Sequence, residues 1–226
     1  MVLPFKMLLE TPIEQWRHDT FWDKEPETIE WIRSFESGGT FFDIGANIGV
    51  YSLFCASIHP DCQIVSFEPH NGNIMRLIDN KNLNGFKNIR AEQMIISDDR
   101  SRSEFIEKSS EVGSSGSQMA DGGSFNTFSI SFLVYFAFNY PIPNYVKIDI
   151  DGQELRVVQG MRETLKEKCL KSVLVEADPG SKEQIVQIFI ENGFTDDNQF
   201  NKLQNHSNVR RQKEGIPVEN IIFTRA

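Results

Sequence analysis

The sequence is poor in the residues that build disulfide frameworks and zinc sites. Its 226 residues include only three cysteines and four histidines. The cysteines, Cys55, Cys62 and Cys169, match no metal-ligand spacing, and the histidines are far apart. An odd number of thiols without such spacing favours reduced side chains, as in cytoplasmic proteins. We therefore expect a cytoplasmic protein without a zinc site.

Long apolar runs and a secretory leader are also missing. The longest apolar run, residues 130–138, is far shorter than the ~20 residues that a membrane-spanning helix needs. Glu10 interrupts the first residues early, and no basic segment precedes an apolar one there. We expect no membrane span and no cleaved leader.

Positive charge is in short supply. The chain has 23 Lys and Arg against 32 Asp and Glu, a net charge of −9. This disfavours a general nucleic-acid binder, which needs a basic surface. A local basic patch remains compatible with the sequence, at Lys202, Arg210, Arg211 and Lys213. The length suits one α/β domain with a sizeable core, and we expect a small-molecule partner rather than a nucleic acid.

The most informative stretch is residues 40–49, where an apolar run ends in an acid and a Gly-x-Asn-x-Gly turn. Apolar residues at helical spacing follow, so the pattern predicts strand, tight turn and helix. Gly45 and Gly49 permit positive φ and a close approach of a ligand to the backbone. The free N–H groups of the next helix would face the same point. In a dinucleotide fingerprint a glycine stands where Asn47 does, and Asp43 would repel a pyrophosphate but suits an ammonium group.

A second acid, Glu68, ends the next apolar run, residues 63–67. A carboxylate at the tip of a second strand can accept hydrogen bonds from both hydroxyls of a ribose. A ligand with an ammonium group and a ribose but no phosphate indicates S-adenosylmethionine. Two alternatives remain open: a nicotinamide-binding fold with a degenerate turn, and a site that binds nothing.

Four motifs in order give a resemblance to a known family. They are residues 42–49 (FDIGANIG), 67–69 (FEP), 82–85 (NLNG) and 147–154 (KIDIDGQE). Together they resemble the FkbM family of S-adenosylmethionine-dependent methyltransferases, over roughly residues 22–176. The resemblance implies a Rossmann-like class I methyltransferase fold and methyl transfer to oxygen on a sugar or glycan-like small molecule.

The fourth motif departs from the family pattern, which resembles Lys-Ile-Asp-Val-Glu-Gly-His-Glu. Here Asp151 stands for the glutamate, a mild change, and Gln153 stands for the histidine. Any role that needs an imidazole at that position is therefore in doubt. The departure shifts the expected catalytic role toward Asp149.

Strands that alternate with helices predict an α/β fold, a mainly parallel seven-stranded sheet with helices on both faces. We expect residues 1–36 to form an N-terminal extension and helix that pack on the domain, and residues 37–226 to form a single methyltransferase domain. Ligands bind at the carboxyl edge of such a sheet. Four acids are expected to end strands there: Asp43, Glu68, Asp149 and Glu176.

Several other segments carry predictions. Residues 88–96 read as the third strand, and Ile95 is a candidate wall for the adenine ring or a core residue. Residues 109–126 are rich in Gly and Ser and indicate a loop, either a mobile cover over the acceptor or an insertion without a role. Residues 128–140 show aromatics at the spacing of a buried helix. Glu25 is either a cofactor contact or a solvated acid at a helix start.

A hydroxyl acceptor needs a base, because its pKa is far above neutral. The candidates share the same edge: Asp149, Asp151, Glu154 and Glu176. Each has a structural alternative. Asp151 and Glu154 match a helix cap and its partner, Asp149 could pair with Lys147 or another buried cation, and Glu176 could accept from a backbone N–H. Clustered carboxylates could also hold a divalent cation, but the motifs do not demand one and we expect no metal site.

The sequence thus predicts an S-adenosylmethionine-dependent O-methyltransferase acting on a sugar-like acceptor. Two other function classes remain open: a nicotinamide-dependent oxidoreductase, and a non-catalytic module that keeps the cofactor and serves a partner. The first would bind nicotinamide cofactors in place of the sulfonium donor. The second would bind the donor without turnover.

Overall fold

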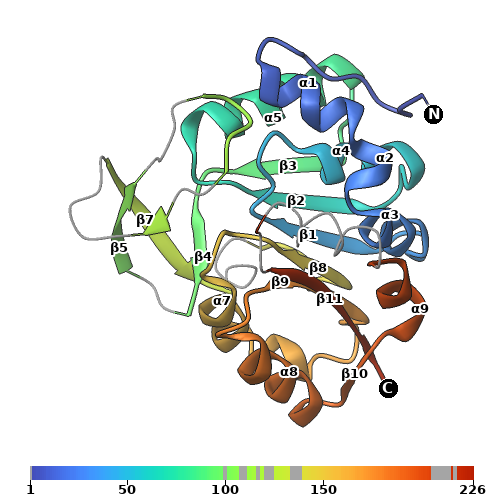
Figure 1. Cartoon of the computed structure of the whole chain (residues 1–226), viewed down its shortest axis with the longest axis vertical. Coiled ribbons are helices and arrows are strands. Elements are labelled where there is room, and N and C mark those ends of the chain that lie inside the picture. The colour runs from blue at the N-terminus through green and yellow to red at the C-terminus, as the bar shows by residue number, and fades with distance from the viewer. Residues whose placement is uncertain are drawn as a thin grey trace.

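A seven-stranded sheet runs through the protein, which we describe from a computed structural model (Figure 1). The structure describes residues 2–98, 101–106, 111–115, 118–119, 125–132, 139–204, 215 and 218–226. In order across the sheet the strands are β10 (Phe194–Asp196), β11 (Glu219–Arg225), β9 (Ser172–Ala177), β8 (Tyr145–Ile148), β1 (Thr40–Ile44), β2 (Gln63–Phe67) and β3 (Ile89–Glu92). All neighbours from β9 to β3 are parallel, and β11 is antiparallel to both β9 and β10. The predicted mainly parallel seven-stranded sheet is confirmed.

Helices cover both faces of this sheet (Figure 1). The helices of the N-terminal half are α1 (Pro12–Asp19), α2 (Phe21–Lys24), α3 (Pro26–Arg33), α4 (Val50–Ile58) and α5 (Asn71–Asn84). Those of the C-terminal half are α7 (Glu154–Gly160), α8 (Lys182–Glu191) and α9 (Asn198–Asn201), with 3₁₀ turns η1 (Thr164–Lys166) and η2 (Lys202–Gln204). Because the strands are buried on both sides, two apolar cores form, one that includes Leu53 and Leu77 and one that includes Val157 and Phe189.

The predicted third strand is split in two. β3 ends at Glu92, the amide of Met94 donates to the Glu92 carbonyl, and the chain enters β4 (Ile95–Ser97). β4 belongs to a second sheet, of order β4-β7-β5-β6, with β7 (Phe125–Ser131), β5 (Ser101–Ile106) and β6 (Gln118–Met119). A tight turn at residues 92–94 thus redirects an apolar run that looks continuous in sequence.

The predicted buried helix over residues 128–140 is wrong for residues 128–131, which lie in β7. β7 pairs with β4 on one side and β5 on the other, so backbone pairing with distant strands overrides the helical spacing of the aromatics. Residues 133–138 lie outside the described residues. Within the Gly/Ser-rich segment, residues 118–119 and 125–126 are strand rather than loop.

The N-terminal residues pack along α5 and are part of the folded unit. The amide of Lys6 donates to the Asn84 side chain, and the amide of Leu8 donates to that of Asn80. Phe5 is buried in the same core as Leu77. None of the helices in the described ranges is both long enough and apolar enough to span a bilayer.

Candidate cofactor and catalytic site

The carboxyl ends of β1, β2, β8 and β9 meet at one edge of the sheet, and each is followed or ended by an acid. Parallel pairing places Ile44 beside both Phe67 and Ile148, and Ile148 beside Val175. The four predicted acids therefore share this edge: Asp43, Glu68, Asp149 and Glu176. The prediction that they converge is a consequence of the parallel register.

The turn after β1 has the left-handed backbone that its sequence indicates. Gly45, Asn47 and Gly49 have φ of 78°, 51° and 86°. A Cβ on Gly45 would lie 1.8 Å from the carbonyl oxygen of Asp149, and one on Gly49 would lie 2.7 Å from Leu77 Cγ. Close packing against the turn after β8 and against α5 therefore requires these glycines, in addition to any need for ligand access.

The N–H groups of this turn donate hydrogen bonds within the protein. The amide of Asn47 donates to Glu68 Oε2 at 2.8 Å, that of Ile48 donates to Asn47 Oδ1, and that of Gly49 donates to the Ala46 carbonyl. A dinucleotide site presents such N–H groups to a pyrophosphate. Here they are engaged, so the turn fits a ligand without phosphate.

Glu68 is a buried carboxylate beside this turn. Its side chain is 6% exposed, and it accepts a second hydrogen bond at Oε1 from the amide of His70. Burial raises the pKa of Glu68 to about 7, against the stabilising effect of the two backbone N–H groups and of the positive charge of Arg17. The carboxyl group can therefore gain or lose its proton near neutral pH.

A buried ion cluster lies beneath the β1 and β8 ends. The Lys147 ammonium, 2% exposed, lies 2.8 Å from Asp149 Oδ2 and 3.8 Å from Asp43 Oδ1. Asp43 also accepts from Ser52 Oγ at 2.6 Å. Burial raises the pKa of Asp43, although Lys147 opposes the shift. Burial also disfavours charge on Asp149, but the charges of Lys147 and Lys24 and the hydrogen bond from Lys147 together lower the pKa of Asp149.

Lys147 has more partners than the predicted pairing with Asp149. Its ammonium also lies 5.2 Å from the ring centroid of Tyr51. Burial disfavours its charge, yet the carboxylates of Asp149 and Asp43 raise its pKa. A lone lysine inside a continuous apolar strand is the sequence signal that indicates such a buried charge.

Glu25 is 1% exposed, so the alternative of a solvated acid at a helix start is wrong. Its Oε2 accepts from the Tyr51 hydroxyl at 2.6 Å, and its Oε1 lies 2.8 Å from the Lys24 ammonium. Its charge acts on both Asp149 and Lys147. Glu25 thus belongs to the ion cluster, and a direct cofactor contact stays a prediction.

The other carboxylates of the fourth motif differ in burial. Glu154 is 2% exposed and accepts from the amides of Ile150 and Gly152 at 3.0 to 3.1 Å. Burial raises the pKa of Glu154, although these N–H groups oppose the shift. The predicted cap pair is wrong in form, because α7 follows Gln153 without a side-chain cap. Asp151 is half-buried with φ of 58°.

The remaining candidates are Glu176 and Ile95. Glu176 is half-buried on β9, opposite Asn220 of β11. Ile95 is 7% exposed in β4, opposite Ser129 of β7, whereas the sheet strand β3 ends at Glu92. The alternative of a core residue for Ile95 agrees with this burial, and its contact with adenine stays a prediction.

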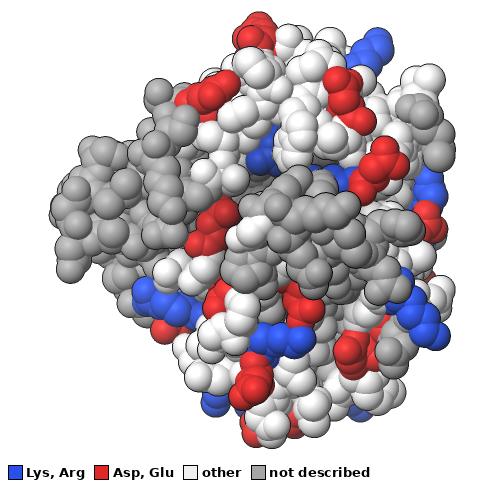
Figure 2. Space-filling model, viewed as in Figure 1, with Lys and Arg blue, Asp and Glu red and all other residues white. Residues whose placement is uncertain are grey.

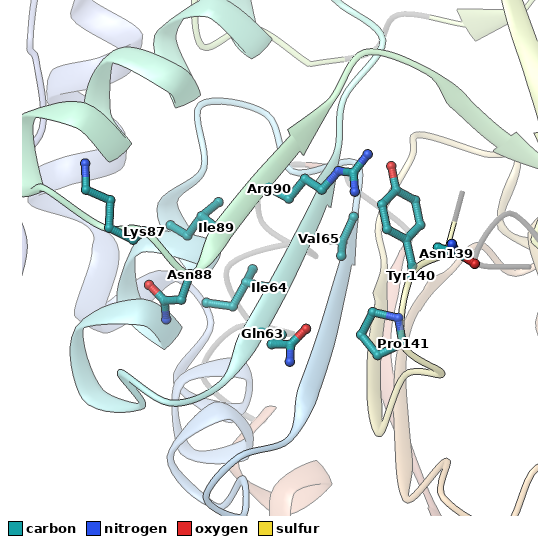
Figure 3. Close-up of a pocket in the computed structure, with 10 residues that line it drawn as sticks. All are labelled: Gln63, Ile64, Val65, Lys87, Asn88, Ile89, Arg90, Asn139, Tyr140 and Pro141. Carbon is teal, nitrogen blue, oxygen red and sulfur yellow. The ribbon is translucent and has the colours of Figure 1, made fainter. Parts of the chain in front are cut away.

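A cavity of about 330 Å³ lies away from this edge, at the opposite ends of β2 and β3 (Figure 3). Gln63, Ile64, Arg90, Tyr140 and Pro141 are among its lining residues, and the Arg90 guanidinium lies 4.3 Å from the Tyr140 ring centroid.

Among the residues that the structure describes, no three His, Cys, Asp or Glu side chains are grouped as metal ligands.

Comparison with known proteins agrees with this geometry. The model of the family described as "Methyltransferase FkbM domain" matches residues 43–211, more than half of the chain. A hexuronic acid methyltransferase, AglP, of Haloferax volcanii is 26% identical over 159 residues. That alignment covers 66% of this chain, and the chain spans only 60% of the length of that relative.

Two solved structures show the same fold at low identity. Fibrillarin of Aeropyrum pernix, in complex with S-adenosyl-L-methionine, is 10% identical, with a TM-score of 0.51 over 90% of this chain and 76% of its own. A ribosomal protein L11 methylase of Lactobacillus delbrueckii subsp. bulgaricus is 13% identical, with a TM-score of 0.50 over 92% of this chain and 79% of its own. Fold, turn geometry and family match together decide against a nicotinamide-dependent oxidoreductase: the chain belongs to the FkbM family of S-adenosylmethionine-dependent methyltransferases.

Proposed function

We propose that this methyltransferase modifies a hydroxyl oxygen of a sugar or glycan-like small molecule, with Asp149 as the base. One observation carries the proposal. The Asp149 side chain is 25% exposed while Lys147 fixes it at 2.8 Å, whereas Asp43, Glu68 and Glu154 are buried. An oriented carboxylate that still reaches solvent suits contact with an acceptor.

The cofactor site consists of the turn after β1 and the buried carboxylates beside it. Glu68 accepts hydrogen bonds from the ribose hydroxyls, and Gly45, Asn47 and Gly49 set the conformation of the adjacent backbone. Asp43 acts on the cofactor's ammonium through its charge, because its own side chain is 1% exposed and bonded to Ser52. The engaged N–H groups of the turn support a ligand that carries an ammonium group and a ribose but no phosphate.

When bound, the cofactor supplies a methyl group on a positively charged sulfur. The chain's own task is to orient the acceptor hydroxyl and to take its proton. Asp149 performs both tasks. Its lowered pKa keeps it ionised at neutral pH, so that it can accept the proton. Glu154 holds the turn that carries Asp149 and Asp151 through the amides of Ile150 and Gly152. Asp151 and Glu176 flank the acceptor from the same edge.

The sugar acceptor is supported by one relative. The AglP protein is named as a hexuronic acid methyltransferase, and it is 26% identical to this chain over 159 residues. Hexuronic acids and neutral hexosides both offer hydroxyl acceptors, so both belong in the test.

The test measures methyl transfer and cofactor binding on the same variants. We expect Asp149→Asn to lower kcat with a hexuronic acid or hexoside acceptor by ~10² to 10⁴, while calorimetry gives a dissociation constant for S-adenosylhomocysteine within about twofold of wild type. Asp79→Asn is the matched control, because Asp79 is exposed on α5, and it leaves both values unchanged. Full activity in Asp149→Asn would refute the assigned base, and cofactor binding without turnover on any hydroxyl acceptor would favour a non-catalytic module.

A further inference from the structure

Residues 111–115 lie between the N-terminal helix and the cofactor turn. On one side, the Thr11 hydroxyl donates to the Val112 carbonyl at 3.1 Å and Arg17 Nε donates to the Gly113 carbonyl at 2.8 Å. Both donors come from the beginning and body of α1. A segment that is far away in sequence is thus held by α1 at two consecutive carbonyl groups.

On their other side, residues 111–115 form hydrogen bonds with residues that surround Glu68. The Gly113 amide donates to Asn73 Oδ1 at 2.8 Å, and the Ser114 carbonyl accepts from both Asn47 Nδ2 at 2.7 Å and Asn73 Nδ2 at 3.2 Å. The Asn47 amide in turn donates to Glu68. Hydrogen bonds, together with the covalent links through residues 113–114 and Asn47, therefore connect Arg17 to the Glu68 carboxylate.

We propose that Arg17 and residues 111–115 form the outer wall of the ribose end of the cofactor site, with Arg17 as a positioning residue for Glu68. Burial supports this placement: Glu68 is 6% exposed, Asn73 2% and Ser114 9%. In the Gly/Ser-rich segment, the described residues 111–115 contact the cofactor turn. The inference rests on the proposed ribose contact of Glu68.

The charges around Glu68 give the wall a measurable effect. Arg17 faces it from α1 and lowers its pKa, and Asp151 faces it from the turn after β8 and raises it. His70 is a third titratable group nearby, and its ring accepts from the Asn73 amide. Glu68 must be ionised to accept two ribose hydroxyls, and its pKa is about 7. Cofactor affinity therefore falls as the pH drops through 7.

Removal of the Arg17 charge raises the pKa of Glu68 further, because that positive charge opposes the effect of burial. For Arg17→Gln we expect the affinity for S-adenosylhomocysteine to be severalfold weaker at pH 7 and nearly equal to wild type at pH 9, where Glu68 is ionised in both. Arg17→Lys keeps the charge and should keep the wild-type pH profile. Arg162→Gln, at an exposed position after α7, is the matched control.

Calorimetric titrations with S-adenosylhomocysteine at pH 6, 7, 8 and 9 test the charge, and hydrogen exchange of the Gly113 amide tests the wall. We expect this exchange to slow when the ligand binds and to be faster in Arg17→Gln. Equal losses for Arg17→Gln and Arg17→Lys at every pH would reduce Arg17 to a structural contact and overturn the inference, as would profiles that match Arg162→Gln. Absence of binding by the wild-type protein at every pH would instead refute the proposed function.

Discussion

At the scale of single residues, the buried site contains fewer cations than carboxylates. The carboxylates of Asp149 and Asp43 share the single positive charge of Lys147, no other cation in the described cluster approaches them as closely, and Asp43 is 1% exposed. Removal of one partner from a buried ion pair leaves the other charge uncompensated, which costs more than the pair itself contributes. The lysine therefore supports both stability and the geometry of Asp149.

The variant Lys147→Met tests this dependence. We expect a loss of ~3–5 kcal/mol in the free energy of unfolding at pH 7, measured by urea denaturation. The loss should shrink at pH 5, because the pKa of Asp43, already raised by burial, rises further without Lys147 and the acid can be protonated. Lys166→Met, at a 63% exposed lysine paired with Glu163, serves as control and should change stability by less than ~0.5 kcal/mol. A loss as small as the control's would contradict the account.

At the scale of elements, the site depends on two turns that touch. The turn after β1 packs against the turn after β8, where Gly45 meets the Asp149 carbonyl. Glu154 then fixes the second turn through backbone amides. The relative position of the cofactor turn and the catalytic carboxylate is thus set by backbone packing between strands that are neighbours in the sheet.

Gly45 and Gly193 make a matched pair, since both have φ of 78° but only Gly45 has atoms within reach of an added Cβ. We expect Gly193→Ala to cost ~1 kcal/mol through left-handed backbone strain alone. Gly45→Ala should cost ~2–4 kcal/mol, because strain and overpacking against a backbone oxygen add. Urea denaturation of both variants measures the difference, and equal losses would show that the contact with Asp149 is not tight.

At the scale of the whole molecule, charge and fold point to different partners. Of two proteins of similar fold, one is named a fibrillarin and the other a ribosomal protein L11 methylase. A similar fold, however, does not show that two proteins share a substrate. This chain has a net charge of −9, and Figure 2 shows acidic and basic side chains interspersed on the face that it draws. Because the net charge is negative, non-specific attraction to phosphate backbones is weak.

We therefore expect no binding of a fluorescently labelled single-stranded RNA at protein concentrations up to ~100 µM and 150 mM salt, which is the weak end of non-specific affinity. Anisotropy titrations at low and at physiological salt measure this. Micromolar affinity with a steep salt dependence would contradict the expectation, and would point to the basic residues around Arg210 and Arg211, which lie outside the described residues.

The sequence by itself determined the fold class, the family and the acids that end the strands. These follow from local patterns: an apolar run followed by Asp43 and a glycine turn, and another followed by Glu68, are visible without any long-range contact. The parallel register then brings the acids to one edge, as the alternation of strands and helices predicts.

Tertiary structure alone decided which acids are buried, which acids are paired and where residues 111–115 lie. The run over residues 88–96 breaks because its second half pairs with β7, and residues 128–131 are strand because they pair with β4 and β5. Burial separates the half-buried Asp149 from the enclosed Asp43 and Glu154. Likewise, hydrogen bonds through residues 111–115 connect Arg17 to the surroundings of Glu68. Such outcomes depend on contacts between residues far apart in the chain, and a local pattern carries no information about the energy of those contacts.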